Sequence, residues 1–147
     1  MNSALIVCAL VLFAFGCKDI KETEGIVETE KVAEVKATQQ QKTVLLSPND
    51  FQNQIIKATE IQLIDVRTLE EFSEGHIASA KNINIKSNEF SAQIETLDKT
   101  KAVYLYCRSG GRSGQAADIL TEMGFTLIYD LEGGITAWMD EDLPTVK

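Results

Sequence analysis

A cysteine opens a short segment that also carries two arginines, Cys107-Arg108-Ser109-Gly110-Gly111-Arg112-Ser113. The segment follows an apolar run at residues 102–106 and precedes a helical pattern, so it lies where a strand passes into a helix. A loop of small residues before a helix N-terminus can point successive backbone N–H groups at one place, where the helix macrodipole adds positive potential. We therefore predict an anion-binding loop with the sulfur of Cys107 at or near its centre.

The predicted loop favours the thiolate form of Cys107 over the thiol. Backbone N–H donors, the helix dipole and the guanidinium of Arg112 each stabilise a charged sulfur, and such surroundings lower the pKa of a cysteine. Gly110 and Gly111 suit an inward-curling loop because glycine adopts positive φ and allows a ligand to approach closely. Over residues 102–117 the two arginines are the only charged residues, so the loop could receive an anion.

Strand-like and helical patterns alternate along the chain from residue 43 onward. Such alternation is typical of α/β domains, in which a mainly parallel sheet is covered by helices on both faces. We expect strands at residues 61–66, 82–85, 102–106 and 126–129, and helices at residues 48–57, 87–97, 114–123 and 135–139. Ligands of open α/β sheets bind at the carboxyl ends of the strands, which is where the Cys107 segment is placed.

Helix starts and core residues can also be assigned. Ser47 before Pro48 is a typical N-cap and first helical residue, and Thr68 with Glu71 has capping-box spacing for a short helix that ends near Gly75. Trp138 is expected to pack the last helix. Four phenylalanines are expected in the core, namely Phe51, Phe72, Phe90 and Phe125.

The string YCRSGGRS at residues 106–113 resembles the active-site loop of rhodanese-type sulfurtransferases. Three further strings resemble family segments in the expected order: LLSPNDF, LIDVRTLEEFSEGHIASAKNINI and LEGGITAW. The resemblance extends over residues 45–143, and one departure is Ser79, where many members carry glycine. It implies a rhodanese-like α/β fold with a mainly parallel central sheet flanked by helices.

The resemblance also implies an activity. Cys107 would take a sulfane sulfur from a small-molecule donor such as thiosulfate, become a persulfide, and pass the outer sulfur to a thiophilic acceptor such as cyanide or a thiol. No metal or other cofactor is implied, because the thiolate makes the bond and the loop stabilises the persulfide anion.

Roles for individual residues follow from the same resemblance. Cys107 and Arg112 are the implied catalytic residues. Arg112 would stiffen the loop and support its charge, with Asp65 as a possible partner, and Arg108 would orient an anionic donor. The implied substrate-binding residues are Arg108, Ser109, Gly110, Gly111 and Ser113.

Other polar residues of the domain are interpreted as structural. Asp65 and Arg67 are expected to form a salt bridge that supports the loop rather than to contact substrate. Glu70 and Glu71 are interpreted as surface and cap residues. His76, the only histidine, is also interpreted as structural, because a nucleophile with a depressed pKa needs no separate base.

Two other functions are considered. Certain phosphatases and arsenate reductases also use a cysteine-to-arginine loop, but with five residues between the two, whereas four stand between Cys107 and Arg112. The shorter loop makes a smaller ring of donors, which is tight for a tetrahedral phosphate. The second alternative is a catalytically idle rhodanese-like module that binds a partner at a membrane, and the intact cysteine and arginines favour the enzyme over it.

The N-terminal part of the chain has a different character. Residues 4–16 form an uncharged apolar run with the length of a signal-peptide hydrophobic region. The string AFGC at residues 14–17 resembles the lipobox of bacterial lipoproteins, which implies cleavage after residue 16, acylation of Cys17, and an exported protein anchored to a membrane facing the periplasm or cell surface. Residues 17–42 are rich in charge and lack aromatic residues and proline, so we predict a flexible tether before a rhodanese domain at residues 43–147.

Composition narrows the remaining possibilities. A length of 147 residues leaves room for one domain, and a net charge of −8 disfavours nucleic acid as a partner. Of the three cysteines, Cys8 lies in the predicted signal peptide and Cys17 is the predicted acylation site. Cys107 would therefore be the one free thiol of the mature domain, which excludes an internal disulfide and disfavours a thioredoxin-like oxidoreductase.

Overall fold

The computed structural model describes residues 42–147 of the chain. The predicted signal peptide, the Cys17 acylation site and nearly all of the predicted tether lie outside these described residues. The elements in chain order are β1 (Lys42–Leu46), α1 (Pro48–Lys57), β2 (Gln62–Asp65), α2 (Leu69–Glu74), β3 (Lys81–Asn82), α3 (Phe90–Ile94), β4 (Val103–Tyr106), α4 (Gly111–Glu122), β5 (Leu127–Leu131) and α5 (Gly134–Asp140). No helix within residues 42–147 combines the length and apolarity needed to cross a bilayer.

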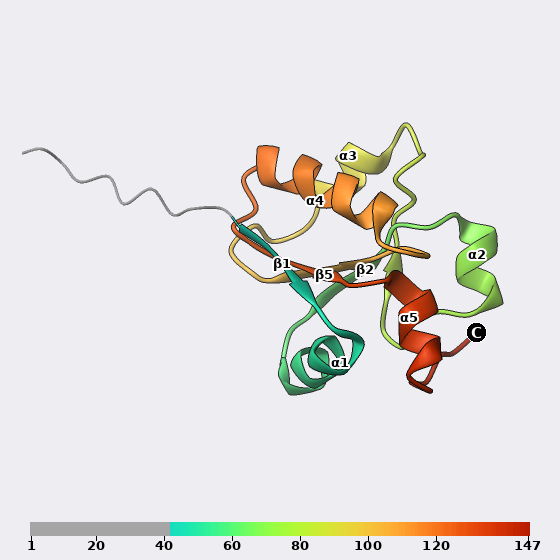
Figure 1. Ribbon diagram of the computed structural model, residues 1–147. Coiled ribbons are helices and arrows are strands. Elements are labelled where there is room, and N and C mark those ends of the chain that lie inside the picture. The colour runs from blue at the N-terminus through green and yellow to red at the C-terminus, as the bar shows by residue number, and fades with distance from the viewer. Residues whose placement is uncertain (1–41) are drawn as a thin grey trace, which may run out of the picture. The chain divides into compact units, whose positions relative to one another are not determined.

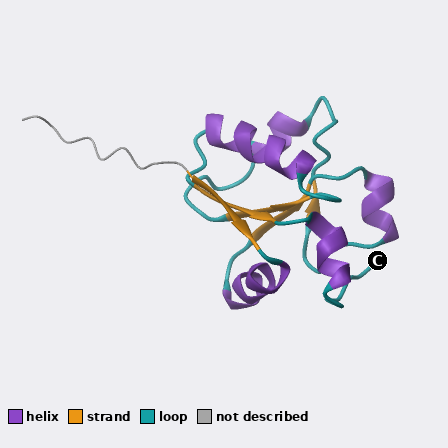
Figure 2. Ribbon diagram, in the orientation of Figure 1, coloured by secondary structure: helices purple, strands orange, loops and turns teal. Residues whose placement is uncertain are grey.

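The strands form a parallel sheet in the order β1-β5-β4-β2-β3. Helices α3 and α4 cover one face of this sheet, and α1 and α5 cover the other (Figure 1; Figure 2). The predicted α/β class with helices on both faces is thereby confirmed. Strand β4 lies between β5 and β2, at the centre of the sheet. Its carboxyl end therefore lies midway along the edge formed by the carboxyl ends of the strands, where parallel α/β sheets bind their ligands.

Each face of the sheet has its own apolar core. On one face Phe90 and Ile94 of α3 pack with Leu120 of α4, and on the other Phe51 of α1 packs with Trp138 of α5. All four residues of β4 are buried, as expected for a central strand covered on both sides. Burying apolar side chains on both faces fixes the strand, and with it the start of the loop that follows.

Two core expectations have different outcomes. Trp138 is buried, packs edge-on against Phe51, and donates its ring N–H to the Pro144 carbonyl at 3.0 Å, so its predicted packing role is confirmed. The prediction that Phe72 is a core residue is wrong. Phe72 is only half-buried and stacks on His76, with 3.7 Å between the ring centroids. It lies on the six-residue helix α2, none of whose side chains is fully buried.

The predicted helix starts at Ser47-Pro48 and Thr68 are confirmed, including a complete capping box between Thr68 and Glu71. The helix predicted over residues 87–97 is shorter, because the Ser87 side chain accepts the Glu89 N–H and holds a turn there instead. The strand predicted at residues 82–85 is reduced to β3. Strand β1 was not predicted as a strand; it forms by parallel pairing with β5, which is remote in sequence.

Candidate active site

Cys107 directly follows β4, in the turn that leads into α4. Its Sγ accepts the Gly110 N–H at 3.1 Å and lies 3.6 Å from the hydroxyl oxygen of Ser113. Burial raises the pKa of this thiol, but hydrogen bonds from the Ser113 hydroxyl and from the backbone of Ser113, Ser109 and Gly110 outweigh it, so the pKa lies below its ordinary value. The loop therefore stabilises a thiolate at its centre.

Gly110 makes the inward turn of this loop. It adopts φ 97° as the N-cap of α4, in the left-handed region that favours glycine. Gly111 does not share this conformation: it is the first residue of α4, and a Cβ added to it would meet no atom within 4 Å. The expectation of positive φ is thus confirmed for Gly110 and wrong for Gly111, and it is the left-handed Gly110 that lets α4 begin three residues earlier than residue 114.

The start of α5 binds the carbonyl groups of the same loop. The Ile135 N–H donates to the Cys107 carbonyl at 2.9 Å, and the Thr136 N–H and hydroxyl both donate to the Arg108 carbonyl, at 3.1 and 2.9 Å. Gly134 lies against these carbonyl groups with φ 61°. Because the Arg108 carbonyl is held on the α5 side, the N–H group of Ser109, which shares its peptide plane, points the other way, and Ser109 is one of the backbone donors that lower the pKa of Cys107.

Arg112 extends from the first turn of α4 toward α2 and binds Glu71. The two side chains form a bidentate pair, with Nη1–Oε2 at 2.7 Å and Nη2–Oε1 at 2.8 Å. This pair raises the pKa of Arg112, to which the negative charge of Cys107 also contributes. The guanidinium therefore serves two anions, the carboxylate of Glu71 and the thiolate.

Asp65 is not the partner of Arg112, which corrects the expectation from the sequence. It is fully buried and pairs with Arg67, whose Nη2 lies 2.6 Å from the Asp65 Oδ2 and donates to the Gly75 carbonyl at 2.7 Å. This salt bridge, which was predicted, ties the end of β2 to the segment after α2. It therefore supports the helix that presents Glu71 to Arg112.

His76 is bound by structural contacts. Its Nδ1 lies 3.0 Å from the Phe72 carbonyl oxygen, and its backbone pairs with Val146 of the C-terminal segment in an antiparallel bridge. These contacts agree with the structural role expected for His76.

A cavity of about 350 Å³ lies beside the loop, and charged side chains of both signs line it together with an apolar wall. Its lining residues are Arg67, Glu71, Glu74, Arg108, Ile135, Thr136 and Met139. The predicted substrate-binding residue Arg108 thus faces a space that can admit a polar molecule. Within residues 42–147 no group of three or more His, Cys, Asp or Glu side chains could hold a metal ion.

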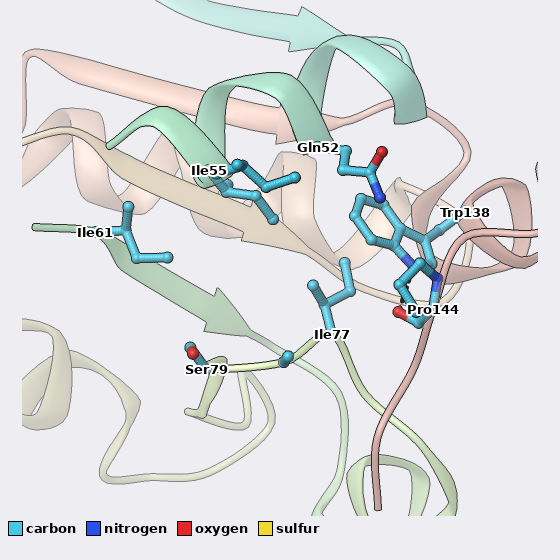
Figure 3. A pocket seen from close by; sticks show the side chains of 9 residues that line it. Gln52, Ile55, Ile61, Ile77, Ser79, Trp138 and Pro144 are labelled. Carbon is cyan, nitrogen blue, oxygen red and sulfur yellow. Dashed lines mark hydrogen bonds between the residues drawn. The ribbon is translucent and has the colours of Figure 1, made fainter. Parts of the chain in front are cut away.

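A second cavity, of about 250 Å³, is formed on the α1 and α5 face of the sheet. Its lining is largely apolar, and Figure 3 shows Ile55, Ile77 and Trp138 around it. None of its nine described lining residues is charged, and it holds none of the predicted site residues. The polar cavity is therefore the one that borders the Cys107 loop, through Arg108.

The family description "Rhodanese-like domain" matches residues 47–141. The chain belongs to the rhodanese family. It is 44% identical over 77 residues to "Uncharacterized protein YqhL" of Bacillus subtilis (strain 168), a match that spans 52% of this chain and only 60% of that protein. It is 38% identical over 90 residues to "Thiosulfate sulfurtransferase GlpE" of Shewanella oneidensis, spanning 58% of this chain and 86% of that protein.

Solved structures include a further protein of similar fold. The polysulfide-sulfur transferase homodimer from Wolinella succinogenes has a TM-score of 0.61 and 31% sequence identity, over 71% of this chain and 78% of that chain. The rhodanese fold expected from the sequence is therefore shown, and so is the kinship with proteins named as sulfurtransferases.

The structure brings Cys107, Gly110, Arg112 and Ser113 together where β4 passes into α4, with residues 111–113 already in the helix, and it adds neighbours that the sequence did not supply. Glu71 was interpreted as a cap alone, but it also binds Arg112. Gly134 was expected only as part of the string LEGGITAW, and no contact with the Cys107 loop was expected of it. That string is the one feature of the sequence that could have pointed to Gly134. The positions of Glu71 and Arg112 in the sequence gave no indication that the two residues form an ion pair.

Replacing Glu71 by glutamine tests how much the ion pair between Glu71 and Arg112 contributes to the stability of the protein. The bond to Arg112 lowers the pKa of Glu71 from 4.5 to about 2, so its stabilisation is fully present above about pH 4.5 and is lost as the pH falls through 2. Glutamine can still accept the Thr68 N–H. We expect Glu71→Gln to lower the free energy of unfolding by about 1 kcal/mol at pH 7, because the pair is partly exposed, and the deficit to vanish near pH 2.

Urea unfolding of both proteins from pH 7 to pH 2 measures this difference. Glu74→Gln, on the same helix, is the matched control and should unfold like wild type throughout this range. A constant difference between Glu71→Gln and wild type at every pH would contradict the assigned ion pair.

Proposed function

We propose that this chain is a sulfurtransferase whose nucleophile is the thiolate of Cys107. The sulfur attacks the outer sulfur of a donor such as thiosulfate, a new S–S bond forms, and sulfite leaves with the electron pair of the broken S–S bond. An acceptor such as cyanide or a thiolate then attacks the outer sulfur of the persulfide. Thiocyanate or a new persulfide leaves, and the Cys107 thiolate is restored with no net change in protonation.

One observation carries this proposal: the Gly110 N–H and the Ser113 hydroxyl converge on the Cys107 Sγ, at 3.1 and 3.6 Å. Donors directed at one sulfur favour the thiolate before the reaction and after it. Arg108 lines the adjacent cavity, where it would bind the negative charge of the donor. The printed names of the Shewanella oneidensis and Wolinella succinogenes proteins support sulfur transfer as the reaction class.

The geometry disfavours the phosphatase alternative. A phosphatase loop must surround several oxygens of a phosphate, whereas the Gly110 N–H and the Ser113 hydroxyl converge on the Cys107 sulfur itself. Four residues between Cys107 and Arg112 also leave a small ring of donors. A single extra sulfur atom suits this ring better than a tetrahedral phosphate.

Intact mass measurement of the purified protein tests the proposal. Incubation with thiosulfate should add one sulfur atom, and subsequent cyanide should remove it and release thiocyanate. Protein alkylated beforehand with iodoacetamide is the control and should gain nothing. If thiosulfate, polysulfide and a persulfide donor all fail to load the protein, the idle binding module is favoured; phosphate-ester hydrolysis without sulfur loading would favour the phosphatase.

We also propose that acylated Cys17 anchors this protein to a bacterial membrane on the exported side. The string AFGC after an apolar run supports this assignment. Cys17→Ser should shift the protein from the membrane fraction to a soluble exported form or leave it unprocessed, as measured by cell fractionation and immunoblotting. Cys8→Ser, within the apolar run, is the control and should stay membrane-bound. A correctly processed Cys17→Ser protein that remains in the membrane would contradict acylation.

A further inference from the structure

A buried carboxyl group lies beside the loop and has no part in the function described so far. Asp130 belongs to β5 and is only 4% exposed. Among the buried side-chain nitrogen and oxygen atoms of residues 42–147, its Oδ1 is the one without a hydrogen-bond partner. An unpaired polar atom in such a position is costly, and that cost calls for an explanation in the function of the site.

The side chain of Asp130 faces α4 and the Cys107 loop. Successive side chains of a strand alternate between faces, and Ile128, two residues earlier, packs in the core beneath α4. Ser113, in the first turn of α4, is also fully buried on this face, and its hydroxyl favours the ionised form of the Asp130 carboxyl. Burial raises the pKa of Asp130 to about 6, despite the opposing effect of Ser113.

Other ionisable groups are absent from this part of the described core. On the same face of the sheet β1 places Leu45 beside Asp130, and β4 places Leu105 beside it. The residues that α4 buries are Ser113, Ala116, Ala117 and Leu120. Helices α1 and α5 pack on the opposite face of the sheet. Helix α3, on the same face as Asp130, carries no ionisable residue. Cys107 is therefore the ionisable group of this face that Ser113 contacts, with 3.6 Å between the hydroxyl oxygen and Sγ.

Ser113 has a single hydroxyl proton and too many acceptors for it. Its oxygen lies 3.0 Å from the Gly110 carbonyl oxygen and 3.6 Å from the Cys107 Sγ. An ionised Asp130 is a further, charged acceptor for the same proton. A protonated Asp130 instead can donate to the Ser113 oxygen, which leaves the serine proton to the sulfur or the carbonyl.

We propose that Asp130 is a positioning residue for Cys107: its protonated carboxyl donates to the Ser113 hydroxyl and directs the serine proton to the sulfur, whereas its ionised form withdraws that proton. The inference deepens the proposed function, because this thiolate is the proposed nucleophile. By linkage, an ionised Asp130 raises the pKa of Cys107, and a Cys107 thiolate raises the pKa of Asp130 by the same free energy. The thiolate is thus best stabilised when Asp130 is neutral.

The rate of alkylation of Cys107 by iodoacetamide, measured from pH 5 to pH 10, tests the proposal. This uncharged reagent reports the thiolate and needs no sulfur donor, so the result is independent of whether the protein transfers sulfur. In Asp130→Asn, which is always neutral and can donate to Ser113, we expect alkylation below the pKa of Cys107 to be at least about threefold faster than in wild type. Asp118→Asn removes the same charge from the exposed face of α4 and should match wild type.

A double variant separates the relay from a simple effect of charge. In a Ser113→Ala background, Asp130→Asn should no longer change the alkylation profile, because the connecting hydroxyl is gone. If Asp130→Asn fails to fold, the smaller neutral variant Asp130→Ser takes its place, with the same expected acceleration. Profiles of the folded Asp130 variant that superimpose on wild type, or an acceleration that persists without Ser113, would overturn the proposal.

Discussion

Cys107→Ser is expected to abolish sulfur loading and to lower sulfur transfer from thiosulfate to cyanide by at least about a thousandfold. A serine hydroxyl in the same place accepts the Gly110 N–H as the sulfur does, but it is hardly ionised at neutral pH and forms no persulfide. Because the two side chains are similar in size, the free energy of unfolding should change by only about 1 kcal/mol. The loss would therefore be chemical rather than structural.

Two measurements together establish this result. Intact mass after thiosulfate should show one added sulfur atom in wild type and none in the variant, and urea unfolding should show that both proteins are folded. Residual loading of the variant would place the reactive sulfur elsewhere and would remove the basis of the proposed mechanism. Ser109→Ala, in the same loop, is a useful comparison because it keeps the backbone N–H groups and the cysteine, so it should still load.

Gly134→Ala is expected to have the second largest effect, although Gly134 lies outside the loop. A Cβ at this position would lie 2.6 Å from the Arg108 carbonyl carbon and oxygen and from the Cys107 carbonyl oxygen. Backbone atoms cannot yield as a flexible side chain does, so the loop or the start of α5 must shift. Displacing a nucleophile by about 1 Å can cost about a hundredfold in rate, which is the expected fall in kcat/KM. We also expect the free energy of unfolding to fall by about 2 kcal/mol.

Gly124→Ala is the matched control for this substitution. Gly124 also has positive φ, at 91°, but a Cβ there would meet no atom within 4 Å. Alanine at this position should therefore destabilise the fold through backbone strain, by about 1 kcal/mol, and leave kcat/KM unchanged. Equal losses of activity in the two variants would mean that strain, rather than the contact with the Cys107 loop, is responsible.

Much of the fold could be predicted because its signals are local in sequence. The N-cap at Ser47 and the capping box at Thr68 depend on residues at most three positions apart. The loop after β4 is also local, since the hydrogen bond from Gly110 to the Cys107 sulfur spans three residues. Ser79 is a further local case: it adopts φ 68°, in the left-handed region that favours glycine, which is the residue that the resemblance led us to expect there.

The sequence did not allow us to predict which charged residues pair around the loop. Asp65 and Glu71 are both acidic, and both precede the loop in the sequence. In the structure Asp65 forms a salt bridge with Arg67, whereas Glu71 binds Arg112, 41 residues later in the chain. The Arg112–Glu71 pair is partly exposed and contributes only about 1 kcal/mol, so energy alone does not select it in advance and the positions of the two side chains decide. The bonds from the Arg67 guanidinium hold the Asp65 carboxylate in place, and the direction of α2 points Glu71 toward Arg112.

The sequence alone predicts an α/β protein with Cys107 at a strand-to-helix turn, because strand and helix periodicity, caps and loop glycines act between near neighbours. Tertiary structure alone brought β5 and α5 to the loop, and with them Asp130 to the face that α4 covers and Gly134 against the Cys107 carbonyl. These contacts follow from the strand order β1-β5-β4-β2-β3, which puts β4 between β5, the next strand along the chain, and the more distant β2. That order is decided by the joint packing of all the helices and strands, a property that no single segment carries.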